Sequence, residues 1–94
     1  MPELIYESDR IYCVDEDNEL IAEITFPAEN GVAVIDHTFV DGSLRGQGVA
    51  GMLVKAAADR IVSDGNKIAA VCSYAKKWFE KHPEYEVITL DAQE

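Results

Sequence analysis

The residues with the clearest chemical potential form a glycine-rich segment, LRGQGVAGMLVKAAA, in the middle of the chain. Gly46, Gly48 and Gly51 fit the G-x-G-x-x-G pattern of a dinucleotide-binding turn. Arg45, Gly48 and Ala50 fit a second pattern, R-x-x-G-x-A, in which backbone N–H groups and an arginine would hold a diphosphate. Both patterns imply a phosphorylated ligand, but they imply different ligands.

The dinucleotide pattern fits its surroundings poorly. Its first glycine should end a strand, whereas five residues, DGSLR, separate Val40 from Gly46. An acidic residue should also follow about 20 positions on to hold the ribose, but from Gly51 that spacing reaches the uncharged residues 71–73. We therefore interpret the G-x-G-x-x-G match as incidental.

The charge distribution favours the diphosphate pattern. The net charge is −10, and residues 1–44 contribute −10, residues 45–81 contribute +4 and residues 82–94 contribute −4. Arg45 thus opens the one basic segment of the chain. Glycines let an anion approach the backbone closely at a helix N-terminus, so we predict a diphosphate site there and disfavour a turn that binds nothing.

Two further side chains could take part in chemistry. Cys72 comes where a predicted strand gives way to a predicted helix, a position that can lower the pKa of a thiol, although a buried structural cysteine is the alternative. His37 shares the alternation of Ala33, Ile35 and Phe39, so it is either a packed core histidine or a catalytic or orienting group.

The first half of the chain predicts an antiparallel meander. The β-rich runs 10–14 and 20–26 flank an acidic turn, as expected of a hairpin. Pro27 and Gly31 mark a second turn, after which residues 32–40 form the predicted third strand.

The second half changes to a helical period. Apolar residues predict a helix from Gln47 to about Asp64, with Gly65 as its left-handed cap. A buried strand over 67–72 and a helix over 73–81, capped by Ser73, follow.

The order of these elements predicts an α/β domain. Residues 32–72 form a strand, helix, strand unit, for which a parallel crossover is expected, so the sheet is mixed. The helix over 73–81 and a short strand over 86–90 complete one domain, 1–94.

Composition narrows the classes of function. The apolar fraction of 48% is typical of a soluble protein, and the start of the chain lacks the basic and apolar regions of a signal peptide, so we expect a cytoplasmic location and no membrane partner. The acidic balance argues against nucleic acid. Cys13 and Cys72 lack metal-site spacing, so we expect no metal, two free thiols and a core position for Cys13.

The segment VDGSLRGQGVAG resembles the pyrophosphate loop of the GNAT superfamily, the CoA-dependent N-acetyltransferases. With HTFV before it and CSYAKKWFEKHPEY after it, the chain is similar over about residues 5–88 to minimal GNAT-like proteins of the acyl-CoA-binding YjdJ type. The resemblance implies a GNAT-like fold, acetyl-CoA or another acyl-CoA as cosubstrate, and acetyl transfer to an unidentified amine on a small molecule or a protein. A non-catalytic acyl-CoA sensor or adaptor is the alternative, and either would be a monomer or a weak dimer.

The resemblance also implies site residues. The backbone of Thr38, Phe39 and Val40 would contact pantetheine, and the diphosphate would be cradled by Arg45, Gly46, Gln47, Gly48, Val49 and Ala50. Cys72 would lie beside the thioester, with direct transfer from CoA to the amine favoured over a covalent route, and His37 would have a catalytic or orienting role. The sequence offers no helical pair between the first two strands, where larger members build the acceptor site, so the acceptor stays open.

Overall fold

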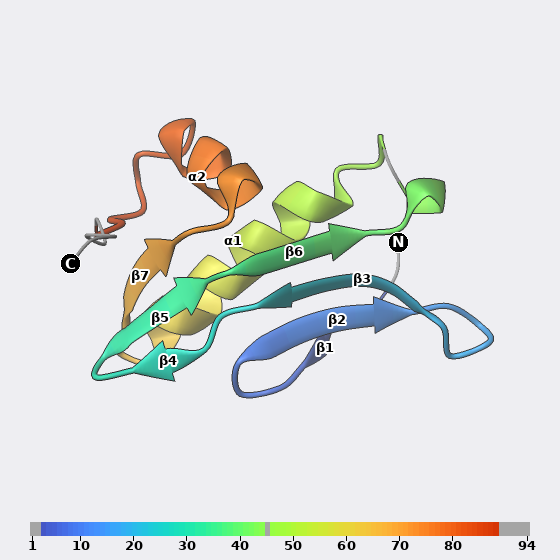
Figure 1. Cartoon of the computed structure of the whole chain (residues 1–94), viewed down its shortest axis with the longest axis horizontal. Coiled ribbons are helices and arrows are strands. Elements are labelled where there is room, and N and C mark those ends of the chain that lie inside the picture. The colour runs from blue at the N-terminus through green and yellow to red at the C-terminus, as the bar shows by residue number, and fades with distance from the viewer. Residues whose placement is uncertain (1–2, 45, 89–94) are drawn as a thin grey trace.

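The computed structural model describes residues 3–44 and 46–88 of the 94-residue chain. The strands and helices of these described residues follow one another in the order β1 (Ile5–Tyr6), β2 (Arg10–Val14), β3 (Leu20–Thr25), β4 (Ala28–Glu29), β5 (Val32–Ile35), β6 (His37–Val40), the 3₁₀ turn η1 (Gly42–Leu44), α1 (Val49–Ser63), β7 (Lys67–Ala70) and α2 (Ser73–Glu80) (Figure 1). The α/β class predicted from the sequence is confirmed.

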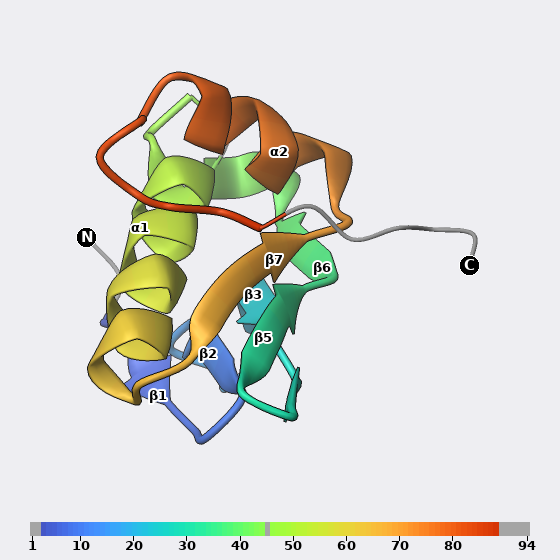
Figure 2. The ribbon, with the colours of Figure 1, turned by 90° about the vertical axis from the view of Figure 1, so that its left-hand side faces the viewer.

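The strands form two sheets, and the consecutive strands β5 and β6 belong to different sheets. The first is antiparallel and has the order β1-β2-β3-β6, and the second has the order β4-β5-β7 with β5 and β7 parallel. Helix α1 connects β6 to β7 and packs across both sheets, and α2 lies beyond β7 (Figure 2). The predicted hairpin, the parallel pair and the mixed strand directions are therefore present.

The prediction of one strand over residues 32–40 is wrong, because the strand breaks at Asp36. The first half pairs with β7 and the second half pairs with β3, while the Asp36 N–H donates a hydrogen bond to the Thr25 carbonyl at 3.2 Å. One extra residue in a strand moves all later side chains to the other face. Ala33 and Ile35 are accordingly buried, whereas His37 is exposed.

The hydrophobic core lies between α1 and the strands. Small and branched side chains fill it, as the alternation in the sequence requires. Its fully buried members include Ile11, Cys13, Ala22, Ile24, Ile35, Leu53, Val54, Ala57, Ala58 and Ile61. The core position predicted for Cys13 is confirmed, and neither α1 nor α2 is long and apolar enough to cross a membrane.

The helix ends match the sequence signals in one case and differ in another. Gly65 has φ of +82°, and the N–H groups of Gly65 and Asn66 donate to the carbonyls of Val62 and Ile61, so the predicted left-handed cap of α1 is confirmed. Cys72, with extended backbone, is the N-cap of α2, and Ser73 is its first helical residue, so the prediction of Ser73 as the cap is wrong.

The predicted last strand is reduced to a single bridge within the described residues. Val87 pairs with Ile68 in a parallel bridge, and the Ile88 N–H donates to the Ile68 carbonyl at 2.9 Å. The remainder of that prediction, residues 89–90, lies outside the described part of the chain.

Candidate functional site

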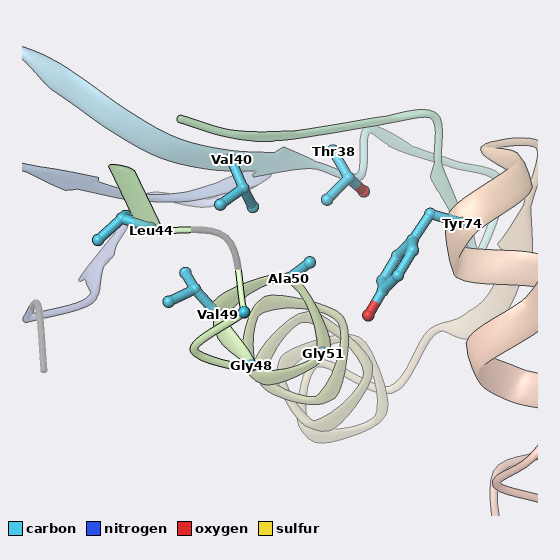
Figure 3. Close-up of a pocket in the computed structure, with 9 residues that line it drawn as sticks. Thr38, Val40, Leu44, Gly48, Val49, Ala50, Gly51 and Tyr74 are labelled. Carbon is cyan, nitrogen blue, oxygen red and sulfur yellow. The ribbon is translucent and has the colours of Figure 1, made fainter. Parts of the chain in front are cut away.

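A cavity of about 440 Å³ opens between strand β6, the start of α1 and the start of α2 (Figure 3). Thr38 and Val40 line it from the strand, and Tyr74 lines it from α2. Its other lining residues are Leu44, Gly46, Gly48, Val49, Ala50 and Gly51. The structure thus brings the glycine loop and part of the predicted pantetheine strand to one cavity.

The loop presents backbone N–H groups to this cavity. Gly46 and Gly48 have φ of +84° and +75°, values that only glycine adopts at little cost. Gly48 is the N-cap of α1, no described side chain caps this end, and the Met52 N–H makes the first helical bond to the Gly48 carbonyl. The N–H groups of residues 49–51 therefore have no partner inside the helix, which makes this end a ready anion site. Arg45 lies outside the described residues.

Hydrogen bonds between neighbouring residues hold the approach to the loop. The Asp41 carboxylate accepts bonds from the backbone N–H and the hydroxyl of Ser43, at 3.0 and 2.6 Å. The Gln47 side-chain amide donates to the Ser43 carbonyl at 3.3 Å. The Gln47 side chain is thus turned toward residues 41–43, which precede the loop, and Gln47 is not among the residues that line the cavity.

Strand β6 offers a backbone edge beside the cavity. Within the described chain β6 pairs only with β3, on its other edge. The N–H groups of Val71 and Cys72 both donate to the Ile35 carbonyl, at 3.0 and 3.2 Å, and these are the last bonds between the parallel strands before β6 departs. Because the Asp41 N–H donates to the Ile21 carbonyl of β3, the alternation of an antiparallel pair turns the backbone groups of Phe39 toward β3 and those of Thr38 and Val40 toward the cavity edge, where they can pair with an extended ligand.

Cys72 lies at the point where the strands separate. Its Sγ is 3.5 Å from the Thr38 Oγ1, to which the thiol donates a hydrogen bond. Partial burial raises the pKa of Cys72. The thiolate, however, would accept hydrogen bonds from the Thr38 hydroxyl and from backbone N–H groups, and these lower the pKa more, so it lies below its ordinary value. Burial raises the pKa of Cys13. The two thiols therefore differ in reactivity.

His37 and Phe39 lie on the face of β6 opposite the cavity-lining residues Thr38 and Val40. The His37 side chain is 52% exposed, and its Nε2 lies 3.4 Å from the Glu23 Oε1, so the packed core histidine is contradicted. Phe39 is 37% exposed on the same face. Neither residue lines the cavity, and the backbone of Phe39 faces its partner Glu23 in β3, so the predicted backbone contact of Phe39 with pantetheine is not supported by this geometry.

Tyr74 is a cavity residue that the sequence pattern did not single out. Its spacing from Trp78, one helical turn, is typical of a packing stripe. Trp78 does pack, but Tyr74 is 42% exposed and its ring stands in the cavity with the hydroxyl directed toward α1 (Figure 3). The available signal was its place in the first turn of the helix that follows Cys72.

Comparison with known families confirms the GNAT-like architecture predicted from the sequence. Residues 10–88 match the family described as GCN5-related N-acetyl-transferase, and a search of curated proteins found no match. The chain belongs to the GCN5-related N-acetyltransferase family.

Solved structures show the same fold. A GCN5-like protein from Staphylococcus aureus, named as a candidate N-acetyltransferase, is 35% identical with a TM-score of 0.75, over 97% of this chain and 92% of that one. An acetyltransferase from Bacillus cereus is 19% identical with a TM-score of 0.66, over 85% of this chain and 56% of that one. The ribosomal-protein-S18-alanine N-acetyltransferase from Escherichia coli is 14% identical with a TM-score of 0.64, over 83% and 54%. The chain thus spans just over half the length of the last two, and their likeness concerns the fold alone.

Proposed function

We propose that the protein binds acetyl-CoA in the cavity at β6 and α1 and catalyses acetyl transfer to an amine. The observation that carries this proposal is a helix N-terminus preceded by two left-handed glycines, with a strand edge beside it, neither of which has a partner among residues 3–44 and 46–88. CoA carries a diphosphate, which suits the N–H groups at residues 46–50, and an extended arm with amides, which suits the edge at residues 38–40. Family membership supports the same ligand.

The side chains around the separation of the strands would then act on the thioester. The acceptor nitrogen attacks the carbonyl carbon, a C–N bond forms and the C–S bond breaks. The backbone N–H groups of β6 stabilise the oxyanion, and the Tyr74 hydroxyl gives its proton to the departing sulfur. The His37 side chain lies on the face of β6 opposite the cavity. We therefore assign that face to the acceptor amine, whose proton the His37 imidazole, beside Glu23, would take.

The similarity to the Staphylococcus aureus protein over nearly both lengths also supports a narrower proposal. We assign the chain to a subgroup of minimal family members, such as the YjdJ type.

Charge reversal at Arg45 tests the binding proposal. Calorimetry should detect binding of acetyl-CoA and CoA by the parent protein and no binding of NAD. Arg45→Glu should weaken acetyl-CoA binding more than tenfold, because a charge-assisted phosphate contact contributes about 1.5–3 kcal/mol and the new carboxylate repels the phosphates. Lys67→Glu, which changes the net charge equally at the start of β7, is the matched control. Equal affinity in folded Arg45→Glu and parent protein would sink the assignment of the loop.

Cys72 separates direct transfer from a covalent route. We expect direct transfer, so Cys72→Ala should keep acetyl-CoA binding and measurable thiol release in the presence of an amine. Because the pKa of Cys72 is lowered, iodoacetamide at neutral pH should modify Cys72 well before Cys13, which is fully buried.

The covalent route makes a different demand, which mass spectrometry checks. It requires one acetyl group on the peptide that contains Cys72 after treatment with acetyl-CoA, removable by amine, and an inactive Cys72→Ala variant. That pair of results would overturn direct transfer. Absence of thiol release from both proteins with a broad panel of amines would instead favour a sensor that binds acyl-CoA without turnover.

A further inference from the structure

Gly51, the third glycine of the loop segment, is the point where α2 touches the first turn of α1. A Cβ at this position would lie 3.2 Å from the Trp78 Nε1 and 3.5 Å from the Tyr74 hydroxyl oxygen. The first distance is shorter than ordinary van der Waals contact, so a methyl group here would require the indole to move by a few tenths of an ångström. Gly51 has ordinary helical backbone, so the missing side chain matters here because it leaves room for the indole, and not because glycine is conformationally free.

The Trp78 indole is held from its other sides by the chain that follows α2. It stacks on the His82 imidazole with ring centroids 3.7 Å apart and an angle of 10° between the planes. The His82 Nδ1 lies 2.7 Å from the Trp78 carbonyl oxygen, and the Tyr85 ring packs at 5.7 Å from the indole. The Tyr85 hydroxyl donates to the Asp59 carboxylate of α1 at 2.7 Å. These contacts give the indole one defined position, called its seat below, between α1 and the segment that follows α2.

Helix α2 is short and meets the rest of the domain on one side. Of its eight residues, Ala75 and Phe79 are buried in the hydrophobic core, and Trp78 packs against that core. Tyr74 and Trp78 are one turn apart and meet α1 at the same glycine, so a shift of the indole away from α1 would carry the Tyr74 ring with the same helix turn. Gly51 and Tyr74 both line the candidate site, so this separation is also a dimension of the cavity.

We infer that Trp78 is a positioning residue, which, seated against Gly51 and stacked on His82, sets the place of Tyr74 in the cavity wall. This inference rests on the proposed function, since Tyr74 is the group that meets the acetyl donor there. It gives the third glycine of the segment a role in the contact between two helices, distinct from the anion site formed by the first two.

The experiment measures acetyl-CoA binding, turnover and Trp78 fluorescence in a small set of variants. Trp78 is the only tryptophan of the chain, so its emission reports this seat directly. Gly51→Ala should shift the emission in the ligand-free protein and weaken acetyl-CoA binding about tenfold, or lower kcat by a similar factor. Alanine favours a helix more than glycine does, so the melting temperature should stay level or rise. Gly42→Ala, at a glycine whose added Cβ has no neighbour within 4 Å, is the matched control and should behave as the parent.

A second substitution shows whether the indole transmits the effect. Trp78→Phe leaves room for the new methyl group, so Gly51→Ala/Trp78→Phe should regain binding to within about threefold of Trp78→Phe alone. If the loss persists unchanged in the double variant, the methyl group meets the ligand itself and the inference is wrong. Parent-like emission and parent-like binding in Gly51→Ala would also overturn it.

The outcome for the proposed function is read separately. If the parent protein binds no acetyl-CoA, the proposed function fails, and the inference is then decided by the ligand-free protein. There, the ring resonances of Tyr74 in NMR spectra should move in Gly51→Ala and return toward the parent positions in the double variant. Unmoved resonances would overturn the positioning role.

Discussion

Replacing Gly48 with valine should reduce acetyl-CoA binding at least a hundredfold. Gly48 has φ of +75° at the N-cap of α1, a conformation that costs other residues about 1–2 kcal/mol and β-branched residues more. The loop must therefore change its backbone, and the N–H groups of the first turn lose the common direction that suits a diphosphate. Calorimetry with acetyl-CoA measures the loss, and denaturation with urea measures the accompanying change in the free energy of unfolding.

Gly65 provides a matched control at the other end of α1. It has φ of +82°, and an added Cβ would meet nothing within 4 Å, so Gly65→Val imposes a similar backbone penalty without steric overlap. Both variants should unfold more easily, and only Gly48→Val should lose binding. A parallel loss of binding in both, or unaltered binding in folded Gly48→Val, would contradict the anion site. Gly48→Ala is the milder change if the valine variant does not fold.

Replacing Tyr74 with phenylalanine should lower kcat about a hundredfold and leave the affinity for acetyl-CoA within about threefold of the parent. The ring stays in the cavity and only the hydroxyl is removed, so binding contacts persist while the proton donor to the leaving sulfur is lost. Steady-state rates of thiol release with a fixed amine, together with calorimetric Kd values, measure the two effects.

Tyr6→Phe is the corresponding control outside the cavity at β6. Tyr6 is exposed on β1, separated from β6 by β2 and β3 in the first sheet, and does not line that cavity, so loss of its hydroxyl should leave both kcat and Kd at the parent values. Equal kcat in the parent and Tyr74→Phe proteins would remove Tyr74 from the chemistry. A large rise in Kd without a change in kcat would assign it to binding instead.

Periodicity predicts most of the fold but not the division of the sheet. Residues 10–14, 20–25 and 49–63 keep one clear alternation or helical period along their whole length, so their structure could be predicted locally. Residues 32–40 are also β-rich, and Asp36, a residue type depleted in strands, does not by itself tell a break from an exposed strand position. The break follows from pairing with β7 on one side of it and with β3 on the other, and such partners are not visible in a single strand.

The candidate site was predictable to the extent that backbone chemistry defines it. The glycines at 46 and 48 indicate an anion site because few other residues tolerate their conformation. Side-chain direction was less accessible: the single-residue shift at Asp36 turns Thr38 toward the cavity and His37 away from it. Tyr74 and Trp78 lie one turn apart on the same face of α2, so periodicity does not distinguish them. Their different surroundings depend on where α1 crosses α2.

The break at Asp36 has a mechanical consequence for the whole domain. Beyond Ile35 the two sheets separate, so on that side the protein is a wedge held closed at one end by strand pairing and at the other by the packing of its helices. An acetyl donor that binds along β6 would pair with the strand edge at the point where the two sheets separate. Part of its binding energy would then hold the two sheets together, so the protein with bound donor should resist thermal unfolding and proteolysis more than the free protein.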